Sequence, residues 1–174
     1  LELMLDCEVK GEKYPEEKIE EVLQEYYGVG GEALQLLERE KQRIIAVEPV
    51  ENQRADEPSI IRFVNELLDQ AFRDRATDVH MEPYKNTFIV RFRIDGILHD
   101  IPVPSQIKQW QPAISSRLKI MAGLDIAEKR LPQDGRILFE MKERSLDLRI
   151  SILPSPHGES IVIRLLRKDM LLSL

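Results

Sequence analysis

The spacing of apolar residues changes near residue 77, and this change constrains the fold more than any other feature. Over residues 58–76, apolar side chains such as Phe63 and Leu67 recur every three or four positions, as in an amphipathic helix. From residue 77 onward the segments alternate instead. In SLDLRISIL, residues 145–153, every second side chain is apolar, which is typical of a strand with one buried face. The pattern therefore predicts an α+β domain.

The same alternation and the turn residues locate the other elements. Asp95-Gly96 is a two-residue hairpin signal between two strands, and either Asp56 or Ser59 can cap the helix that begins at Pro58. We expect a largely antiparallel sheet with helices packed on one face. The expected strands are 77–82, 88–94, 97–103, 136–142, 145–153 and 159–167, and the expected helices are 58–76 and, roughly, Pro112 to Ala122.

Residues 1–46 are expected to be a partial, mainly helical N-terminal subdomain, because they hold too little apolar surface for a core of their own. A helix with a stripe of apolar residues begins at Pro15 and stops at Gly28. Residues 47–57 are polar and form a linker. The main domain spans 58–168, and 169–174 begin a further linker. Since the chain starts without Met, we expect it to be part of a longer protein.

Composition excludes several classes of protein. Cys7 is the single cysteine, which rules out a disulfide framework and a cysteine zinc site within one chain. There is no apolar run of the roughly 20 residues needed to span a bilayer, and the first residues do not form a signal peptide. Residues 1–57 hold 16 acidic and 7 basic residues (16 − 7 gives a net charge of −9), whereas residues 58–174 hold 15 acidic and 18 basic (18 − 15 gives +3). That small excess, without aromatic–basic interleaving, disfavours nucleic-acid binding.

Common enzyme signatures are absent. None of the eight glycines is followed by lysine, so there is no phosphate-binding loop, and no serine or cysteine lies in a nucleophile elbow. His80 and Glu82 share one strand face, but no further ligands follow at metal-site spacing, so we predict no metal site. A structural role is favoured for His80, hydrogen-bonded beside the helix at 59–75.

The arginines remain as candidates for binding an anion, since a guanidinium grips phosphate or carboxylate in a planar, bidentate manner. Each of them is also compatible with an ordinary surface ion pair. Arg130 is favoured for a functional role, because the Pro-Gln-Asp-Gly sequence after it, read as a turn, restricts its side chain. The candidates on shared strand faces are Arg91, Arg93, Arg149 and Arg164, and those at turns or strand ends are Arg130, Arg136 and Arg144.

Four motifs in this order and spacing resemble the second N-terminal domain of the secretion ATPases, which drive type II secretion and type IV pilus assembly. The resemblance covers about residues 58–168. The first 46 residues are similar, less specifically, to the end of the preceding N-terminal domain, which would dock on the platform. The motifs are ATDVHMEPY, RFRIDGIL, SRLKIMAGLDIAEKRLPQDGR and DLRISILPSPHGESIVIRLL.

The resemblance implies a cytoplasmic hexamer docked on an inner-membrane platform protein. ATP and Mg would be bound by a RecA-like motor domain outside this chain, and the present domain would close over the nucleotide and offer arginines to its phosphates. On matching positions these are Arg130 and Arg144, with Arg136 and Arg149 as second choices. We expect this chain alone to bind no cofactor, to show no ATP hydrolysis and to be a monomer or weak dimer, whereas the full-length protein would hydrolyse ATP.

A second interpretation is a non-catalytic interaction module. Its arginine face would bind acidic groups of a neighbouring subunit, and its acidic N-terminal part would bind the platform protein. Salt bridges from Arg91 or Arg164 to carboxylates would favour this interpretation.

Overall fold

The computed structural model describes residues 12–16, 18, 19, 22, 55–104, 107–141 and 144–166. Residues Glu16, Lys18, Ile19 and Val22 are helical, which agrees with the helix expected from Pro15; the rest of the predicted N-terminal subdomain and both predicted linkers lie largely outside the described residues. The elements are α4 (Pro58–Arg73), β1 (Asp78–Pro83), β2 (Phe88–Ile94), β3 (Ile97–Ile101), α5 (Ile107–Ala122), β4 (Gln133–Met141), β5 (Arg144–Ser155) and β6 (Gly158–Leu166).

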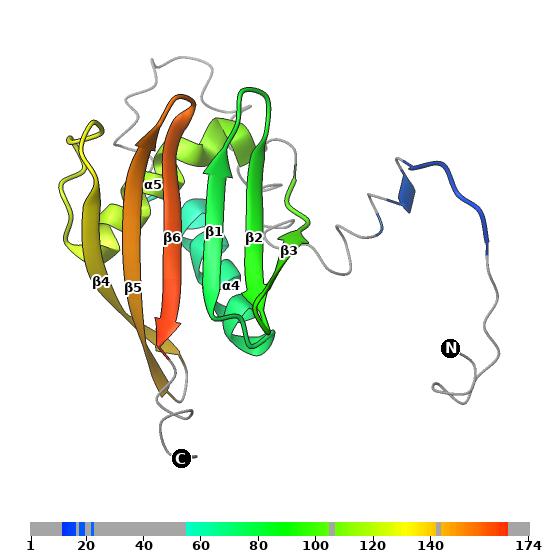
Figure 1. The fold of residues 1–174 in the computed structure, drawn as a ribbon, viewed down its shortest axis with the longest axis horizontal. Coiled ribbons are helices and arrows are strands. Elements are labelled where there is room, and N and C mark those ends of the chain that lie inside the picture. Colours follow the sequence, from blue (N-terminus) through cyan, green and yellow to red (C-terminus); the bar gives the residue numbers. More distant parts are fainter. Residues whose placement is uncertain are drawn as a thin grey trace.

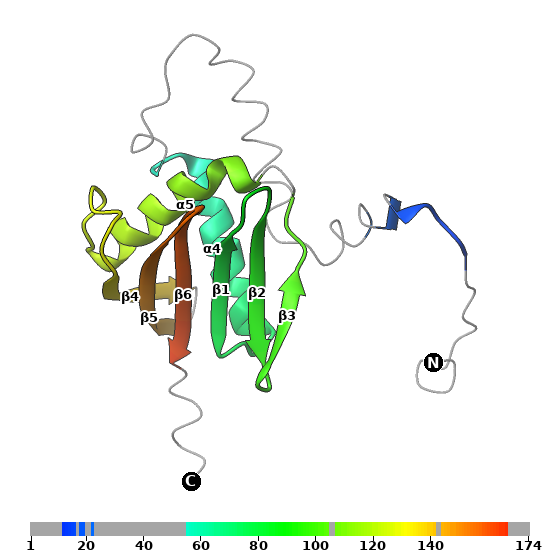
Figure 2. The ribbon, with the colours of Figure 1, turned by 45° about the horizontal axis from the view of Figure 1, so that its top comes forward.

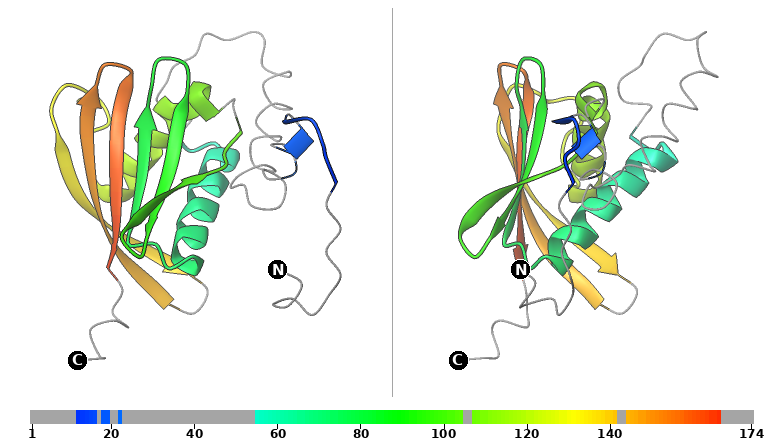
Figure 3. Two further views of the ribbon diagram at one scale, coloured as in Figure 1. Left: turned by 45° about the vertical axis from the view of Figure 1, so that its right-hand side comes forward. Right: turned by 90° about the vertical axis from the view of Figure 1, so that its right-hand side faces the viewer.

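The strands form one antiparallel sheet in the order β3-β2-β1-β6-β5-β4 (Figure 1). Helices α4 and α5 cover one face, and no described element covers the other, which we call the open face (Figures 2 and 3). The first and last strands, β1 and β6, lie side by side in the middle of the sheet. The predicted α+β class, with a largely antiparallel sheet and helices on one face, is therefore confirmed.

Helix α4 buries its apolar stripe against the sheet. Its N-cap is Glu57, without a side-chain hydrogen bond, and Pro58 occupies the first turn, where its missing N–H would have no helical partner in any case. The prediction that Asp56 or Ser59 caps this helix is therefore wrong. Fully buried α4 residues are Ile60, Phe63, Val64, Leu67, Leu68 and Ala71.

Helix α5 begins at Ile107, earlier than predicted. Pro112 lies inside the helix, where it lacks the N–H that would reach the carbonyl of residue 108. Ile107 and Trp110 are almost completely buried, and this packing offsets the lost hydrogen bond. The sequence signal placed Pro112 at the helix start because proline is commonest there.

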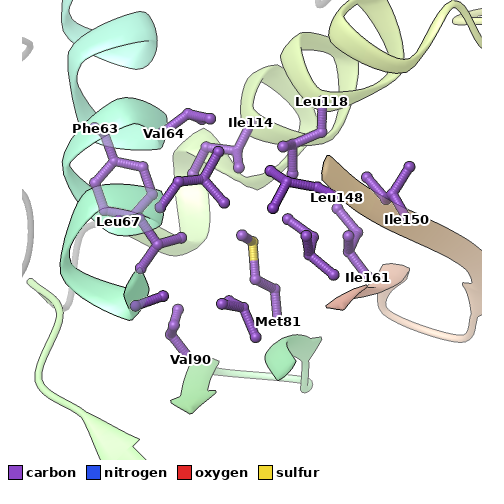
Figure 4. Packing of buried hydrophobic residues seen from close by; sticks show 14 of the residues in the cluster. Phe63, Val64, Leu67, Met81, Val90, Ile114, Leu118, Leu148, Ile150 and Ile161 are labelled. Atoms are coloured by element: carbon purple, nitrogen blue, oxygen red, sulfur yellow. The ribbon is translucent and has the colours of Figure 1, made fainter. Parts of the chain in front are cut away.

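The alternating strands send one set of side chains into a single core between the sheet and the two helices. Val79 and Met81 of β1, Ile161 and Ile163 of β6, and Leu148 of β5 are at most 1% exposed. Figure 4 shows these strands meeting α4 and α5 around Met81 and Leu118. The alternation predicted for β1 and β5, and the outward position predicted for Arg164 on β6, are confirmed.

Two turns differ in how well they were predicted. Asp95 and Gly96 form the expected hairpin, both with positive φ (50° and 84°). Residues Gln133, Asp134 and Gly135, by contrast, belong to strand β4 and not to a turn. They pair with Ile152, Ser151 and Ile150 of β5, so cross-strand pairing overrides the local turn signal. In the described part of the chain, no helix is long and apolar enough to cross a bilayer.

Candidate functional site

The open face of the sheet carries a row of charged residues at one level across five strands. In the register, Arg136 of β4 lies opposite Arg149 of β5, and Arg149 lies opposite Arg164 of β6. Arg164 lies opposite Asp78 of β1, and Asp78 lies opposite Arg93 of β2. We call these five residues the arginine row. Each of the four arginines sits on an outward strand position, as the alternation predicted for Arg93, Arg149 and Arg164. Arg136 is a correction, since β4 begins at Gln133 and Arg136 therefore lies inside the strand, not at a turn or at a strand end.

Asp78 neutralises one end of this row. Its carboxylate accepts a hydrogen bond from Nε of Arg164 at 3.1 Å, and it lies 3.5 Å from Nε of Arg93. Burial raises the pKa of Asp78, but hydrogen bonds from Thr77 and Arg164 and the charge of Arg164 outweigh burial, so that the pKa is lowered overall. Asp78 is 7% exposed, which makes it the buried carboxylate beneath two more accessible guanidinium groups.

The other end of the row keeps an excess of positive charge. Arg136 forms a two-point ion pair with Asp147, with Nε 2.6 Å from Oδ1 and a second bond from its terminal nitrogen to Oδ2. Arg149, which lies between Arg136 and Arg164, is exposed and has no ion pair with any residue that the structure describes. Like charges directly opposite on neighbouring strands are destabilising. The row therefore presents guanidinium groups that are available to an external anion.

Arg130 lies apart from the row, in the loop 123–132 between α5 and β4. Its side chain is 88% exposed. Its backbone N–H donates to Oε1 of Glu128 at 2.6 Å, and its guanidinium lies 3.3 Å from Oε2 of the same carboxylate. The backbone hydrogen bond, followed by the side-chain one, lowers the pKa of Glu128. Glu128 thus holds the backbone of Arg130 closely and its guanidinium more loosely, and the Arg130 side chain stays largely in solvent.

Arg144 is at the opposite end of β4 from Arg130. It is the first residue of β5 and pairs with Met141, the last residue of β4. Strand β4 has nine residues, and a strand rises about 3.4 Å per residue, so its ends are roughly 27 Å apart. Arg130 and Arg144 of one chain are therefore not brought together on one phosphate group, whereas Arg136 and Arg149 are direct neighbours.

His80 does not lie where the sequence placed it. It is on the open face, opposite Arg91 and Val162 in the register, and the helices cover the other face. Its Nε2 is buried without a hydrogen-bond partner among the described residues. Burial lowers the pKa of His80, and the charge of Arg93 lowers it further. The predicted hydrogen bond beside the helix is therefore wrong, because the alternation that turns Val79 and Met81 inward turns His80 outward.

No group of three or more histidine, cysteine, aspartate or glutamate side chains suited to a metal ion occurs among the described residues. His80 and Glu82 do share one face, but Glu82 is held by Arg91, whose terminal nitrogen lies 2.6 Å from Oε2. The same carboxylate accepts a hydrogen bond from the hydroxyl of Tyr84 at 2.9 Å.

Sequence reasoning missed the carboxylates that hold the arginines. Asp78 and Asp147 occupy outward positions of alternating strands, and this pattern could have identified them as partners. It also missed Lys119, which is fully buried on α5 and lies 2.6 Å from Oε1 of Glu159. A lysine four residues after Ser115 on the buried side of a helix was the available signal.

Comparison with known proteins identifies the family of the chain. The family model for "Type II/IV secretion system protein" matches residues 53–173. The chain belongs to the type II/IV secretion system protein family. The resemblance seen in the four sequence motifs is therefore confirmed.

Relatives from both branches of this family are similar to the chain. The type II secretion system protein HxcR of Pseudomonas aeruginosa is 51% identical over 114 residues, which cover 66% of this chain and 24% of the relative. The type II secretion system ATPase E of Vibrio cholerae is 45% identical over 114 residues, covering 66% and 22%. The type IV pilus assembly ATPase PilB of Myxococcus xanthus is 42% identical over 164 residues, covering 90% and 29%.

The chain spans about a quarter of the length of the curated relatives it matches. A crystal structure of the pilus retraction motor PilT with bound ADP aligns with 60% of this chain and 29% of that chain, with a TM-score of 0.40 and 15% identity. That likeness is too distant to contribute to the assignment, which rests on the family match.

Proposed function

We propose that residues 58–168 form the domain of a secretion ATPase that closes over ATP bound in a RecA-like motor domain and supplies arginines to its phosphates. The observation that carries this proposal is a set of exposed guanidinium groups in a chain of this family. A guanidinium placed against the γ-phosphate neutralises charge that spreads over the oxygens during transfer. ATP and Mg would be held by the motor domain, and this chain alone would not hydrolyse ATP.

Arg130 is the proposed first arginine. It is exposed, its backbone is held by Glu128, and its guanidinium is engaged only in a long, solvent-exposed pair within the described structure. Such a pair is worth about 0–1 kcal/mol, so the side chain could exchange Glu128 for a phosphate at little cost. Arg144 is the second proposed residue. Because it lies at the other end of β4, we propose that Arg130 and Arg144 of one chain act on different nucleotides or at different stages of closure.

Arg136 and Arg149 are proposed to contact the nucleotide as a pair. Their side by side placement suits an anion with several oxygens, since each guanidinium can donate two parallel hydrogen bonds. The phosphates would supply Arg149 with a counter-charge, which no residue in the described part of the domain supplies. Arg136 would have to share its guanidinium with Asp147, so we expect it to contribute less than Arg149.

The wider assembly follows from the same proposal. Residues 1–46 would belong to a preceding domain that docks on an inner-membrane platform protein, 47–57 would link it to the closing domain, and 169–174 would begin the linker to the motor. The intact protein would be a cytoplasmic hexamer, peripheral to the membrane through its platform, that powers type II secretion or type IV pilus assembly. Nucleic acid has no part in it.

A second candidate function is a non-catalytic interaction module that binds acidic groups of a neighbouring subunit. The ion pairs of Arg91 with Glu82 and of Arg164 with Asp78 favour it, because they show that this face accommodates carboxylates. These pairs lie within the domain, however, and they satisfy the charges that a partner would otherwise meet. The closing domain therefore remains the preferred proposal.

The test is the ATPase rate of the full-length protein with Arg130→Ala. An arginine supplied to the γ-phosphate is worth about 10³–10⁵ in rate, so we expect a loss of that order, and Arg130→Lys should be nearly as slow because lysine lacks the fork of donors. Arg144→Ala, Arg136→Ala and Arg149→Ala extend the series. Arg73→Ala is the matched control, since Arg73 is an exposed arginine of α4 that pairs only with Asp69 in the described structure.

Sedimentation of the same variants separates the two candidates. The closing domain predicts that Arg130→Ala still forms hexamers and binds ATP but turns it over slowly. Unchanged turnover in Arg130→Ala would refute the assigned role. Loss of the hexamer with normal turnover per assembled ring would support the interaction module instead.

A further inference from the structure

A buried ion pair lies beneath the loop that carries Arg130. Lys119 of α5 is 0% exposed, and its Nζ lies 2.6 Å from Oε1 of Glu159 at the start of β6. Glu159, itself 8% exposed, also accepts a hydrogen bond from the hydroxyl of Ser115, one turn earlier on α5. Both charges are thus removed from solvent and satisfied by named partners.

The same lysine reaches into the loop. Nζ of Lys119 donates to the carbonyl oxygen of Glu128 at 2.6 Å. That carbonyl accepts a second hydrogen bond, at 3.1 Å, from Nε2 of Gln133 at the start of β4. Gln133 also bonds the backbone of Asp125 in both directions, with Nε2 3.0 Å from the carbonyl oxygen and Oε1 2.9 Å from the amide nitrogen. The loop is therefore tied to the domain from the helix and from the strand at once.

The hydrogen bonds from Lys119 and Gln133 hold the chain two residues before Arg130. The carbonyl of Glu128 is held by Lys119 and Gln133, and the side chain of Glu128 holds the backbone N–H of Arg130 at 2.6 Å. Close packing adds to the restraint: a Cβ at Gly135 would come within 3.0 Å of Ala122 and 3.1 Å of Leu124, so a larger residue there would push against the end of α5 and the start of the loop.

Stability alone does not explain a buried lysine at this position. Replacing a buried ion pair with well-packed apolar residues is often neutral or stabilising, and Lys119 is the one charged residue among the buried residues of α5, which include Ile114 and Leu118. What an apolar side chain cannot supply is a donor to the Glu128 carbonyl. The charge is retained where it fixes the course of an exposed loop.

We propose that Lys119, anchored by Glu159, is a positioning residue that sets the orientation of Arg130 toward the nucleotide. This inference rests on the proposed function of Arg130. The lysine does not touch the nucleotide. It acts through the Glu128 carbonyl, and Gln133 assists it from β4. The motif SRLKIMAGLDIAEKRLPQDGR, residues 116–136, then acts as one unit, in which Lys119, Glu128 and Gln133 hold the loop that presents Arg130.

The first measurement tests the positioning without activity. Backbone amide order parameters of residues 124–132 are compared in this chain, in Lys119→Met and in Lys108→Met. Lys108 is the matched control, because it lies on the same helix and also donates to a backbone carbonyl, that of Tyr84, at 2.6 Å. We expect values near 0.85 in the wild type and the control to fall toward 0.6 in the loop of Lys119→Met, with the sheet unchanged.

The second measurement uses the full-length protein. A misplacement of about 1 Å can cost on the order of 10²-fold in rate, so Lys119→Met should lower kcat by about that factor with little change in KM for ATP. In an Arg130→Ala background the same change should lower kcat less than about twofold, since two residues acting through one contact are not additive. Lys108→Met should leave kcat unchanged.

The outcomes separate this inference from the proposed function. A rigid loop in Lys119→Met overturns the positioning role. A mobile loop with normal kcat supports the tie but overturns the role of Arg130. Equal losses from Lys119→Met with and without Arg130 also overturn the positioning role. If Lys119→Met does not fold, Gln133→Ala removes the other donor to the Glu128 carbonyl from a half-buried position, and we expect the same loop mobility and the same dependence on Arg130.

Discussion

The two faces of the sheet are built from the same strands and differ in almost every physical respect. On β6, Ile163 is fully buried against the helices, whereas its neighbour Arg164 has a side chain that is 66% exposed on the open face. On β5, Leu148 and Arg149 show the same contrast. The helix-covered face is apolar except for Glu159, which pairs with Lys119 of α5, and the open face carries cations at one level on four of its six strands.

The contrast shows which face is selected for stability. Apolar burial at about 25 cal/mol per Å² favours folding wherever it occurs, so the covered face needs no further explanation. Three arginines lie side by side, Arg136, Arg149 and Arg164, and although Asp147 and Asp78 pair with the outer two, the charge of Arg149 between them opposes folding through repulsion. A domain that needed only to fold would not place them there, and this is why the open face is the better place to look for function.

The largest expected effect on stability comes from truncating a buried side chain on the helix-covered face. Ile163→Ala should lower the free energy of unfolding by about 2–5 kcal/mol, because it removes apolar contacts and leaves a cavity. Leu138→Ala is the control: Leu138 points from β4 to the open face and is 64% exposed, so its loss should change stability by no more than about 0.5 kcal/mol. Urea denaturation of this chain measures both, and equal losses would show that the open face is covered in solution.

A smaller effect is expected at Asp78, the buried carboxylate of the open face. Asp78→Asn should cost about 1.5–3 kcal/mol near neutral pH, because it weakens charged hydrogen bonds to Arg164. The pKa of Asp78 is lowered in the folded state, so its contribution is complete above the unfolded value of about 3.9 and is lost as the pH falls through the folded value. Wild type and variant should therefore converge in acid. Asp100→Asn, at an exposed carboxylate on β3, is the control. A difference that persists below the folded pKa would contradict the ion-pair explanation.

The smallest expected effect is a gain in stability, obtained by removing one charge from the open face. Arg149→Thr should raise the free energy of unfolding by about 0.2–1 kcal/mol, since it removes repulsion from Arg136 and Arg164 and introduces a good strand former. Arg164→Thr should lower it, because Arg164 also pairs with Asp78. Thermal unfolding of both variants at low salt gives the answer. Destabilisation by Arg149→Thr would mean that the row is not under repulsive strain.

Much of the fold could be predicted from the sequence, because the spacing of apolar residues along the chain is a local property. Helix α4, the alternating faces of β1 and β5 and the outward position of Arg164 on β6 followed from spacing alone. The start of α5 was misplaced at Pro112, since the burial of Trp110 that carries the helix past the proline is a tertiary contact. The start of β4 was misplaced for the same reason: Gln133 to Gly135 look like a turn until β5 pairs with them.

The sequence by itself determined which residues face the helices and which face outward, because a strand repeats every two residues whatever lies beside it. Only the tertiary structure decided which outward residues are neighbours. The order β3-β2-β1-β6-β5-β4 and its register place Arg136, Arg149 and Arg164 at one level, and the fold brings Lys119 to Glu159. These contacts join distant segments of the chain, and strand pairing between such segments is set by the packing of the whole domain.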